Sequence, residues 1–283
     1  GSTIKTLTVA SLIDTGMVGP ETQVVAPYKY KLPWGDIIKD SYKHEDQRLT
    51  LTGVLRNSSN TGLVQIGDDV PVSTRFEYLE KFGLGKASGI NFEGESGGIF
   101  ESYKSWDGLT KLTTMFGQGM ATTPLQVASA YQAIANGGER ISPRLVDGCI
   151  TKSGELVSQP KQTNTRVVSE KTAKITTAML EKVVEQGGVG RYARISGYRV
   201  GGKSGTAQIS EGAGYGSRHA ISFVGYAPAE DPQYVVAITY YKPTTIVSSI
   251  GAVPSFKSIM QQVLRHYRVP PSTGKSADIA TEW

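Results

Sequence analysis

Three short stretches of the chain carry side chains that could act together on a carbonyl carbon. Ser2 and Lys5 form the pattern S-x-x-K at the start of the chain, Ser58-Ser59-Asn60 forms S-x-N, and Lys203-Ser204-Gly205 forms K-[ST]-G. Each pattern alone arises often by chance, and Gly1-Ser2 is also the remnant that a cleaved expression tag leaves. The occurrence of all three in this order favours a serine nucleophile activated by lysine.

The first pattern supplies a nucleophile and a base. Ser2 and Lys5 lie three positions apart on a predicted helix, so their side chains share one face. A lysine acts as a base only when its pKa falls, which burial and a nearby cation such as Lys203 would cause. The helix N-terminus at Ser2 also offers backbone N–H groups to a developing oxyanion.

The other two patterns supply proton transfer and substrate binding. Ser58 can relay a proton to a leaving amine, and Asn60 can hydrogen-bond a substrate amide. Gly205 leaves room for a substrate backbone beside a strand. Two structural alternatives stand beside this interpretation: a helix cap at Ser58-Ser59-Asn60 and a solvated sheet-edge lysine at Lys203. Neither alternative accounts for the coexistence of the three patterns.

A fourth pattern indicates different chemistry. Residues 197–204 fit G-x-x-x-x-G-K-[ST], the phosphate loop that works between a strand and the N-terminus of a helix. Here a helix and a turn precede the pattern, and residues 205–209 read as a strand. We therefore predict that ATP does not bind at this segment.

Composition excludes several function classes. The 283 residues suffice for one large domain or two, and the net charge of +5 includes no basic run of the kind that binds nucleic acid. Cys149, the only cysteine, forms no intramolecular disulfide, and its strand-like surroundings predict a buried thiol. The three histidines lack metal-ligand spacing. Because the sequence shows no signal peptide and no membrane-length apolar run, we expect a soluble chain from which any anchor is absent.

The first two thirds of the chain read mostly as helices joined by glycine-rich loops. Thr123 begins one helix through a capping box with Gln126, because its hydroxyl and the glutamine amide can each satisfy a free backbone N–H group. Residues 84–108 read as a loop. The predicted helices cover residues 2–17, 71–82, 123–137 and a segment that begins after Ser169.

Near residue 198 the pattern changes to strands. The segments GKSGTAQIS, HAISFVGYA and QYVVAITYYKP predict an antiparallel meander, which a helix then covers. Residues 269–283 are rich in proline and polar residues and are predicted to be partly disordered. The apolar stripe of the covering helix comprises Phe256, Ile259, Met260, Val263, Leu264 and Tyr267.

On these motifs the chain resembles the transpeptidase domain of a class B penicillin-binding protein, in particular the division-specific, septal type. The likeness covers nearly the whole chain and includes SSNTGLVQIG, MFGQGMATTPLQVASAYQAIANGG, GYRVGGKSGTAQ and HAISFVGYAPAEDPQYVVAI. The stretch YKHEDQRLTLTGVLRNSSN resembles actinobacterial members. The resemblance implies an α/β (α+β) fold of the serine β-lactamase type, in which an antiparallel sheet flanked by helices and an all-helical lobe enclose a cleft.

The resemblance also implies how the chain is divided. Residues 1–283 form one transpeptidase domain, with a helical lobe at about 6–197, a sheet lobe and C-terminal helix at about 198–268, and a tail at 269–283. The family domain has strands before S-x-x-K that this chain lacks, together with an anchor and a pedestal. We therefore expect the strand at 233–242 to pair with a separate upstream segment, to pair with a neighbouring molecule, or to be exposed along its edge.

In the reaction that the resemblance implies, Ser2 attacks the D-Ala-D-Ala bond of a peptidoglycan stem peptide with Lys5 as its base. An amine from a neighbouring stem then takes the acyl group. Ser58 shuttles the proton, Asn60 binds the donor, and Lys203 supports Ser58 electrostatically. β-Lactam antibiotics mimic the donor and trap the serine.

Further roles follow from the same resemblance. The hydroxyls of Ser204 and Thr206 bind the donor carboxylate beside Gly205, and the backbone N–H groups of Ser2 and Thr206 form the oxyanion hole. No metal or cofactor is needed. The expected partners are stem peptides, β-lactams and a division glycosyltransferase, without nucleic acid. The expected location is the extracytoplasmic face of the bacterial membrane, which the native protein would reach through its anchor.

Two other classes share the acylation step. A serine β-lactamase or D,D-carboxypeptidase releases the acyl group to water, and a β-lactam sensor domain signals instead of turning over. Ser59 stands where the β-lactamase pattern S-D-N has Asp, which favours the synthetic branch. The motifs have no adjacent acidic residue to activate water, and Glu93, Glu95 and Glu101 lie in a loop. We therefore predict a long-lived acyl-enzyme.

Overall fold

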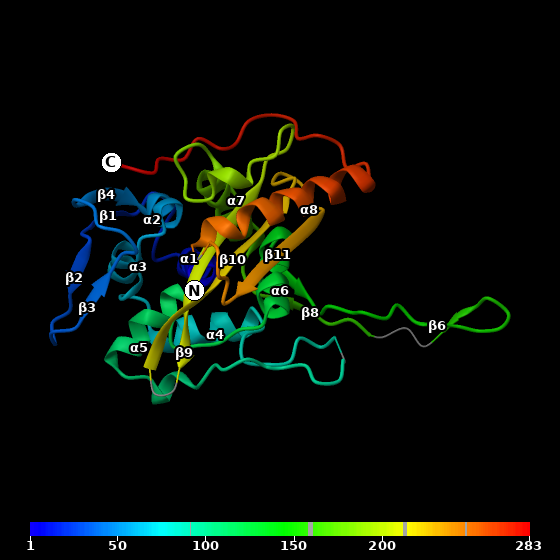
Figure 1. Ribbon diagram of the computed structural model, residues 1–283, viewed down its shortest axis with the longest axis horizontal. Coiled ribbons are helices and arrows are strands. Elements are labelled where there is room, and N and C mark those ends of the chain that lie inside the picture. Colours follow the sequence, from blue (N-terminus) through cyan, green and yellow to red (C-terminus); the bar gives the residue numbers. More distant parts are fainter. Residues whose placement is uncertain (91, 158–160, 212–213, 247) are drawn as a thin grey trace.

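A three-stranded antiparallel sheet lies at the centre of the molecule (Figure 1). Strand β10 (Gly214–Ala227) pairs with β9 (Gly201–Glu211) on one side and with β11 (Tyr234–Tyr241) on the other. The predicted meander is therefore confirmed. This computed structural model describes residues 1–90, 92–157, 161–211, 214–246 and 248–283.

The two faces of the sheet bury different side chains. Phe223 packs against Phe256 of helix α8 (Val253–His266), with ring centroids 4.6 Å apart. The neighbouring residues Val224 and Tyr226 instead join the core that contains helices α1, α6 and α7. This division follows from the alternation of successive side chains along a strand. Because directly paired residues share a face, Lys203, opposite Val224, lies on the side of α1.

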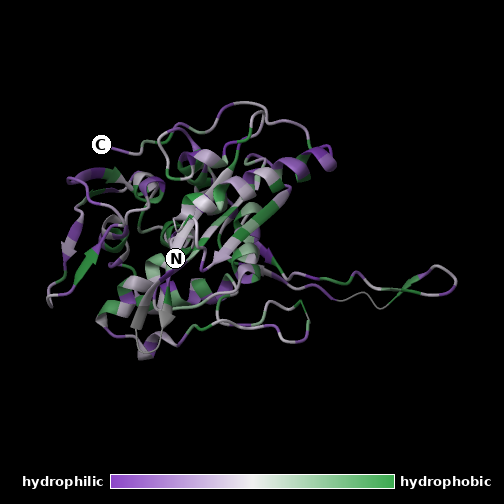
Figure 2. Ribbon diagram, viewed as in Figure 1, coloured by the Kyte–Doolittle hydropathy of each residue, from purple (hydrophilic) through white to green (hydrophobic). Residues whose placement is uncertain are grey.

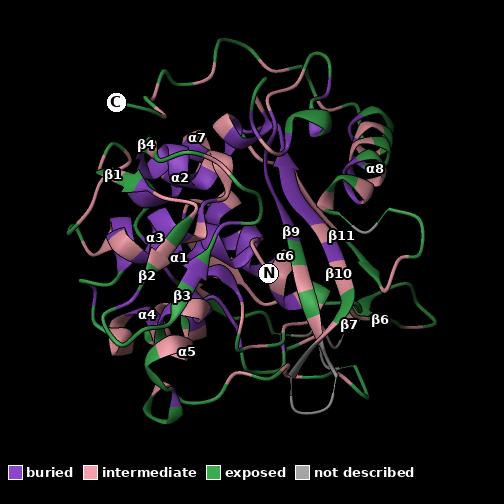
Figure 3. Cartoon of the chain, turned by 60° about the vertical axis from the view of Figure 1, so that its left-hand side comes forward, coloured by how far each residue is buried: buried purple, intermediate pink, exposed green. Residues whose placement is uncertain are grey.

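Helix α1 (Ile4–Asp14) runs through the core and not along the surface. Its residues from Ile4 to Ile13 are all buried (Figure 3), as in a helix surrounded by protein on all sides. The predicted helix over residues 2–17 is therefore present but shorter. The apolar periodicity of the sequence predicted one buried face, whereas the helix is buried on all sides. The side chain of Lys5, within this buried stretch, therefore has almost no access to water.

The remaining predicted helices are also confirmed. The capping box at Thr123 is complete, since its hydroxyl accepts from the Gln126 N–H group and the Gln126 side chain accepts from the Thr123 N–H group. The stripe of α8 is only partly buried, because Ile259 and Tyr267 are exposed. In the described ranges no helix is long and apolar enough to cross a bilayer. The other helices are α2 (Leu51–Asn57), α3 (Asn60–Gly67), α4 (Val72–Lys81), α5 (Gly108–Thr113), α6 (Pro124–Ala135) and α7 (Glu170–Val184), with short 3-10 turns η1 (Tyr103–Ser105), η2 (Thr114–Phe116), η3 (Arg191–Ala193) and η4 (Ser249–Gly251).

The helical part of the chain also carries short two-stranded ribbons that the sequence analysis did not predict. Strands of two to four residues are too short to show alternation, and turn residues interrupt them. The ribbons pair β1 (Gln23–Ala26) with β4 (Gln47–Thr50), β2 (Lys29–Lys31) with β3 (Ile37–Lys39), β5 (Glu139–Ile141) with β8 (Asn164–Arg166), and β6 (Cys149–Ile150) with β7 (Leu156–Val157).

Strands β6 and β7 lie far out on an arm that projects from the body of the molecule (Figure 1). Cys149 is exposed there, so the prediction of a buried thiol is wrong. The strand-like sequence forms only a two-residue ribbon with no core beneath it, and the adjacent Ile150 is 74% exposed.

The end of the C-terminal tail is ordered, contrary to prediction. The Thr50 N–H group donates to the carbonyl of Thr281 at 3.1 Å, and the Thr50 hydroxyl donates to the carbonyl of Ala280 at 2.6 Å. The Arg48 guanidinium lies 3.8 Å from the centre of the Trp283 ring. These contacts hold the tail across the N-terminus of α2, which leads to the S-x-N motif.

Strand β11 lies at an edge of the sheet. Among the described residues it pairs with β10 alone, and its middle part, residues 235–238, is hydrophobic (Figure 2). A groove of about 530 Å³ runs beside it, between Pro124 of α6 and Ile259 of α8. Of the three arrangements expected for this strand, the structure shows exposure along its edge. The pairing of β11 with an upstream segment or a neighbouring molecule stays a prediction.

Candidate active site

The hydroxyl of Ser58 lies between two lysine side chains. Lys203 Nζ is 3.0 Å from Ser58 Oγ, and Lys5 Nζ is 3.3 Å from the same atom. The three residues come from β9, from the end of α2 and from α1. The fold therefore brings one residue of each predicted motif into a single hydrogen-bonded group.

Lys5 is suited to accept a proton because of where α1 lies. Its side chain is 0% exposed, and burial lowers its pKa from the ordinary value of 10.5 to about 7, although the charge of Asp40 acts in the opposite direction. A group with this pKa is partly neutral near pH 7 and can serve as a base. The sequence analysis expected a nearby cation to help lower this pKa, but burial is the main cause.

Lys203 reaches the same hydroxyl from the sheet. Its Nζ also donates to the carbonyl of Ser204 at 3.1 Å. Burial lowers the pKa of Lys203 well below its ordinary value, and the charge of Lys5 lowers it further. Two ammonium groups so close together repel each other, which favours a state in which one of them is neutral. The structural alternative of a solvated edge lysine is wrong, since Lys203 is 0% exposed.

The backbone at Ser58 is held in a conformation that favours glycine. Ser58 follows the last residue of α2 with φ 61° and ψ 36°, in the left-handed region. Its carbonyl accepts a hydrogen bond from Lys5 Nζ. Strained backbone of this kind persists only where surrounding contacts determine it, and it concentrates at functional sites.

The predicted helix cap at the S-x-N motif exists, but the middle serine forms it. Ser59 Oγ accepts from the Gly62 N–H group at 2.9 Å and so caps α3. This leaves the Ser58 hydroxyl to the two lysines. Asn60 Nδ2 donates to the carbonyl of Lys39 at 2.7 Å, which leaves Asn60 Oδ1 to accept a hydrogen bond from a substrate N–H group.

Ser2 lies in the turn before α1, against strand β9. A Cβ atom placed on Gly1 would lie 3.0 Å from the Thr206 carbonyl oxygen, and one placed on Gly205 would lie 3.1 Å from Thr3 Cγ2. The residues on either side of Ser2 thus contact the K-[ST]-G segment. This position sets Ser2 beside the backbone of Thr206, with which it is expected to form the oxyanion hole.

Packing within the protein also favours glycine at position 205, while the expected room for a substrate backbone stays a prediction. A Cβ atom there would lie 2.7 Å from Ser222 Oγ, besides its contact with Thr3. The protein itself occupies the space, because Ser222 of β10 and the residue before α1 both pack closely on β9. Gly205 is therefore required for the approach of helix to strand.

Comparison with known sequences and structures decides the family. The profile described as "Penicillin binding protein transpeptidase domain" matches residues 1–261. The chain belongs to this family. The match confirms the resemblance that the three motifs indicated and, with it, the α/β fold of penicillin-binding transpeptidases.

Relatives of this transpeptidase domain include actinobacterial proteins. Penicillin-binding protein PbpB of Mycolicibacterium smegmatis is 33% identical, covering 96% of this chain and 44% of the relative. Peptidoglycan D,D-transpeptidase FtsI of Escherichia coli K12 is 32% identical, covering 98% and 45%. The crystal structure of penicillin binding protein 3 from Mycobacterium tuberculosis complexed with ampicillin matches with a TM-score of 0.92 at 32% identity, covering 100% of this chain and 65% of that one. The chain spans less than half the length of these two curated relatives.

In this transpeptidase domain, strand β9 has a free edge, since within the described residues it pairs only with β10. Ser204 and Thr206, two residues apart, lie on the face of β9 opposite to Lys203. Ser204 is buried, whereas Thr206 is exposed. The same strand argues against a phosphate loop, because Gly201–Glu211 is extended where such a loop needs a helix.

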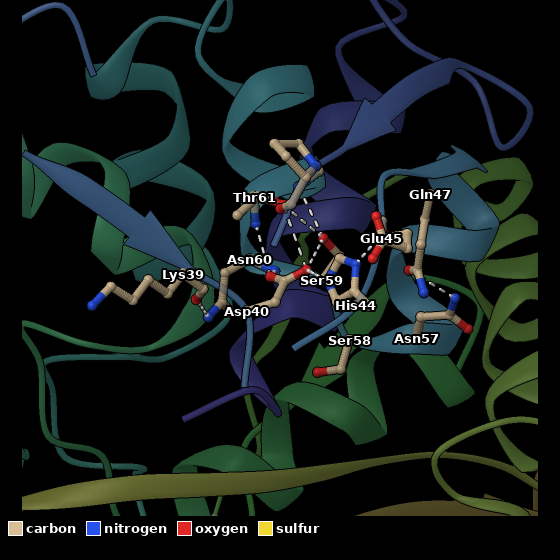
Figure 4. Close-up of polar contacts among 12 residues, drawn as sticks. Lys39, Asp40, His44, Glu45, Gln47, Asn57, Ser58, Ser59, Asn60 and Thr61 are labelled. Carbon is tan, nitrogen blue, oxygen red and sulfur yellow. Dashed lines mark hydrogen bonds and ion pairs between the residues drawn. The ribbon is translucent and has the colours of Figure 1, made fainter. Parts of the chain in front are cut away.

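The sequence analysis missed an acidic residue at the S-x-N motif. The carboxylate of Asp40 accepts from the Ser59 hydroxyl at 2.7 Å and from the Thr61 N–H group at 3.1 Å (Figure 4). Asp40 stands about twenty positions earlier in the chain, and only the fold of β1 to β4 brings it there. No pattern in the sequence marks it. In the part of the chain that the structure describes, no group of three or more metal-ligating side chains forms a metal site.

Proposed function

We propose that the chain carries the catalytic centre of a peptidoglycan D,D-transpeptidase that cross-links stem peptides through a serine acyl-enzyme. The observation that supports this most directly is the contact of Ser58 Oγ with both Lys5 Nζ and Lys203 Nζ. A hydroxyl held between two buried amines can pass a proton in either direction. Membership of the transpeptidase family supplies the substrate class.

Acylation begins when Ser2 Oγ attacks the carbonyl carbon of the penultimate D-alanine of the donor. The neutral amine of Lys5 takes the hydroxyl proton, since its pKa of about 7 leaves part of the population unprotonated at neutral pH. The C–N bond then breaks. The departing D-alanine amine receives a proton through Ser58, and an ester with Ser2 remains.

The acceptor stem reverses these steps. Its amine nitrogen attacks the ester carbonyl and loses a proton to the same group of residues. Ser2 Oγ departs and takes a proton back from Lys5, so a new amide bond replaces the one that was broken. The backbone N–H groups of Ser2 and Thr206 hold the oxyanion in both steps. Deacylation by an amine therefore needs no additional base.

The donor peptide lies in an extended conformation along the free edge of β9. Backbone groups on an unpaired strand edge bind an added strand. Ser204 and Thr206, which share a face, bind the terminal carboxylate, and Asn60 Oδ1 accepts from a donor amide. In the division that we propose, with a helical lobe at 6–197 and a sheet lobe at 198–268, this strand would lie at the boundary between the two.

The cellular setting belongs to the same proposal. The two curated relatives described above, a penicillin-binding protein and a D,D-transpeptidase by name, are each more than twice as long as this chain. We assign the domain to septal wall synthesis at the extracytoplasmic face of the membrane. A division glycosyltransferase, which makes the glycan strands that carry the stem peptides, is the partner.

The test is intact-mass spectrometry after incubation with a penicillin. We expect the mass to rise by one drug molecule, with the adduct on Ser2, and Ser2→Ala to carry no adduct. Ser105→Ala is the matched control, because Ser105 is an exposed serine in η1 and its loss should leave the adduct in place. An adduct on another residue, or none in folded protein, would contradict the assignment.

The lifetime of the adduct separates transpeptidase from β-lactamase. The only carboxylate that the structure places against the motifs within the described residues, Asp40, is buried and bonded to the protein, so it has no free oxygen for a deacylating water. We expect the acyl-enzyme to persist for hours. Rapid loss of the adduct with catalytic hydrolysis of nitrocefin would instead support the β-lactamase alternative.

A further inference from the structure

The carboxylate of Asp40 is the centre of a buried hydrogen-bond cluster beneath the S-x-N motif (Figure 4). Its Oδ1 accepts from the backbone N–H groups of Asn60 and Thr61, the latter at 3.1 Å. Its Oδ2 accepts from the Ser59 hydroxyl at 2.7 Å and lies 3.5 Å from the Thr61 hydroxyl. The three residues that follow Ser58 thus all form hydrogen bonds with the side chain of Asp40, through a side chain, a backbone N–H group or both.

His44 closes the cluster from the other side. Its Nε2 lies 3.1 Å from Asp40 Oδ2, and since a carboxylate only accepts, the ring donates this hydrogen bond. The side chains of His44 and Asp40 are 7% and 4% exposed. The rings of Tyr28 and Tyr42 lie 6.0 Å and 5.2 Å from that of His44. Asp40 is therefore also held by His44, a residue without a proposed part in the reaction.

We propose that Asp40, supported by His44, is a positioning residue that holds Ser58 between Lys5 and Lys203. The proposal rests on the proposed function and extends it to a residue outside the three motifs. Ser58 needs such support because it follows the end of α2 in a left-handed conformation, which an unsupported serine rarely adopts. The next residue, Ser59, is fixed both by Asp40 and by its cap on α3.

Asp40 also acts on the site through its charge. Its carboxylate favours the protonated form of Lys5 and so opposes the effect of burial on the pKa of that lysine. Removing the charge while keeping the shape should lower the pKa of Lys5. The acid limb of the pH profile of the acylation rate would then move to lower pH, because Lys5 loses its proton at a lower pH. A residue with a purely structural role would not shift this limb.

The experiment compares the full chain with its Asp40→Asn variant. The second-order rate of acylation by a fluorescent penicillin is measured from pH 5 to pH 9, and thermal unfolding checks the fold. We expect the rate above the acid limb to fall roughly tenfold or more, as for the loss of hydrogen bonds to a charged group, and the limb to move to lower pH. Asp36→Asn is the matched control, since Asp36 is exposed and its carboxylate accepts a hydrogen bond from the Trp34 ring at 2.8 Å, away from the S-x-N motif.

Each outcome decides the question. If wild-type protein is not acylated at Ser2, the proposed function fails. If it is acylated and folded Asp40→Asn matches it in rate and pH profile, only the role of Asp40 fails. A slower Asp40→Asn with an unmoved acid limb would likewise overturn the role, because the effect would then be structural. If Asp40→Asn does not fold, Ser59→Ala decides: a rate reduced about threefold to tenfold with the limb unmoved supports the role, and a wild-type rate overturns it.

Discussion

Replacing Lys5 with methionine should stabilise the protein while abolishing its activity. The burial of Lys5 displaces its pKa from 10.5 to about 7, and because one pKa unit corresponds to 1.36 kcal/mol, the folded protein bears a penalty of roughly 5 kcal/mol when this lysine is charged. Methionine has a similar length and no charge. Its cost is the loss of two hydrogen bonds to Ser58, together about 2 kcal/mol. We expect Lys5→Met to raise the free energy of unfolding by about 3 kcal/mol at pH 6.

The pH dependence of this gain follows from the direction of the pKa shift. The folded state binds the Lys5 proton less tightly than the unfolded state, so the penalty is fully present below pH 7, decreases as pH rises, and is absent above the unfolded value of 10.5. The stabilisation by Lys5→Met should therefore shrink between pH 7 and pH 10 and reverse there, when only the lost hydrogen bonds remain.

Urea unfolding at pH 6 and pH 10 measures the effect. Lys171→Met serves as the control, because Lys171 is exposed at the start of α7 and its replacement should change the unfolding free energy by less than about 0.5 kcal/mol at either pH. If Lys5→Met is less stable than wild type at pH 6, or if its advantage does not depend on pH, burial is not what lowers the pKa of Lys5.

Three further substitutions test the fold around the site. Arg199→Ala leaves Glu181, 3% exposed, without the bidentate partner that binds it at 2.7 Å, and should cost about 3 kcal/mol in urea unfolding, against under about 0.5 kcal/mol for exposed Arg194→Ala. Gly205→Ala should slow penicillin acylation roughly tenfold or more by forcing α1 from β9, whereas Gly19→Ala, with open space around it, should not; equal rates would refute this packing. Thr50→Ala removes both the cap of α2 and a bond to the tail, and should cost about 1 to 2 kcal/mol and speed hydrogen exchange at the Trp283 N–H group; unchanged exchange would show that the tail is held elsewhere.

Local sequence signals accounted for the long elements well. The central strands and α8 are long enough to show their periodicity, and the capping box at Thr123 marks a helix start by chemistry that needs no distant partner. The three motifs predicted Ser58, Lys5 and Lys203 as neighbours because their order and spacing match a known type of site. The structure places these three side chains within hydrogen-bonding distance.

The features that escaped prediction depend on contacts distant in sequence. Asp40 is one carboxylate among many until β1 to β4 fold and bury it under the S-x-N motif. The composition of the tail predicts partial disorder, yet the ring of Trp283 stacks against Arg48. Arg48 lies in β4, part of a ribbon that was too short to predict from the sequence. Cys149 lies in a strand-like run, but burial of such a run requires a second layer, and the arm supplies none.

The narrow sheet places its two edges close together. Among the described residues, β9 carries Lys203 and forms one edge of the sheet, β11 forms the other, and β10 lies between them, so β9 and β11 lie about 10 Å apart at the usual strand spacing. A right-handed twist is shared by all strands of a sheet. The pairing at β11 and the orientation of β9, which carries Lys203, therefore belong to one continuous twisted surface. A segment that pairs with β11 would therefore lie only a few strand spacings from Lys203.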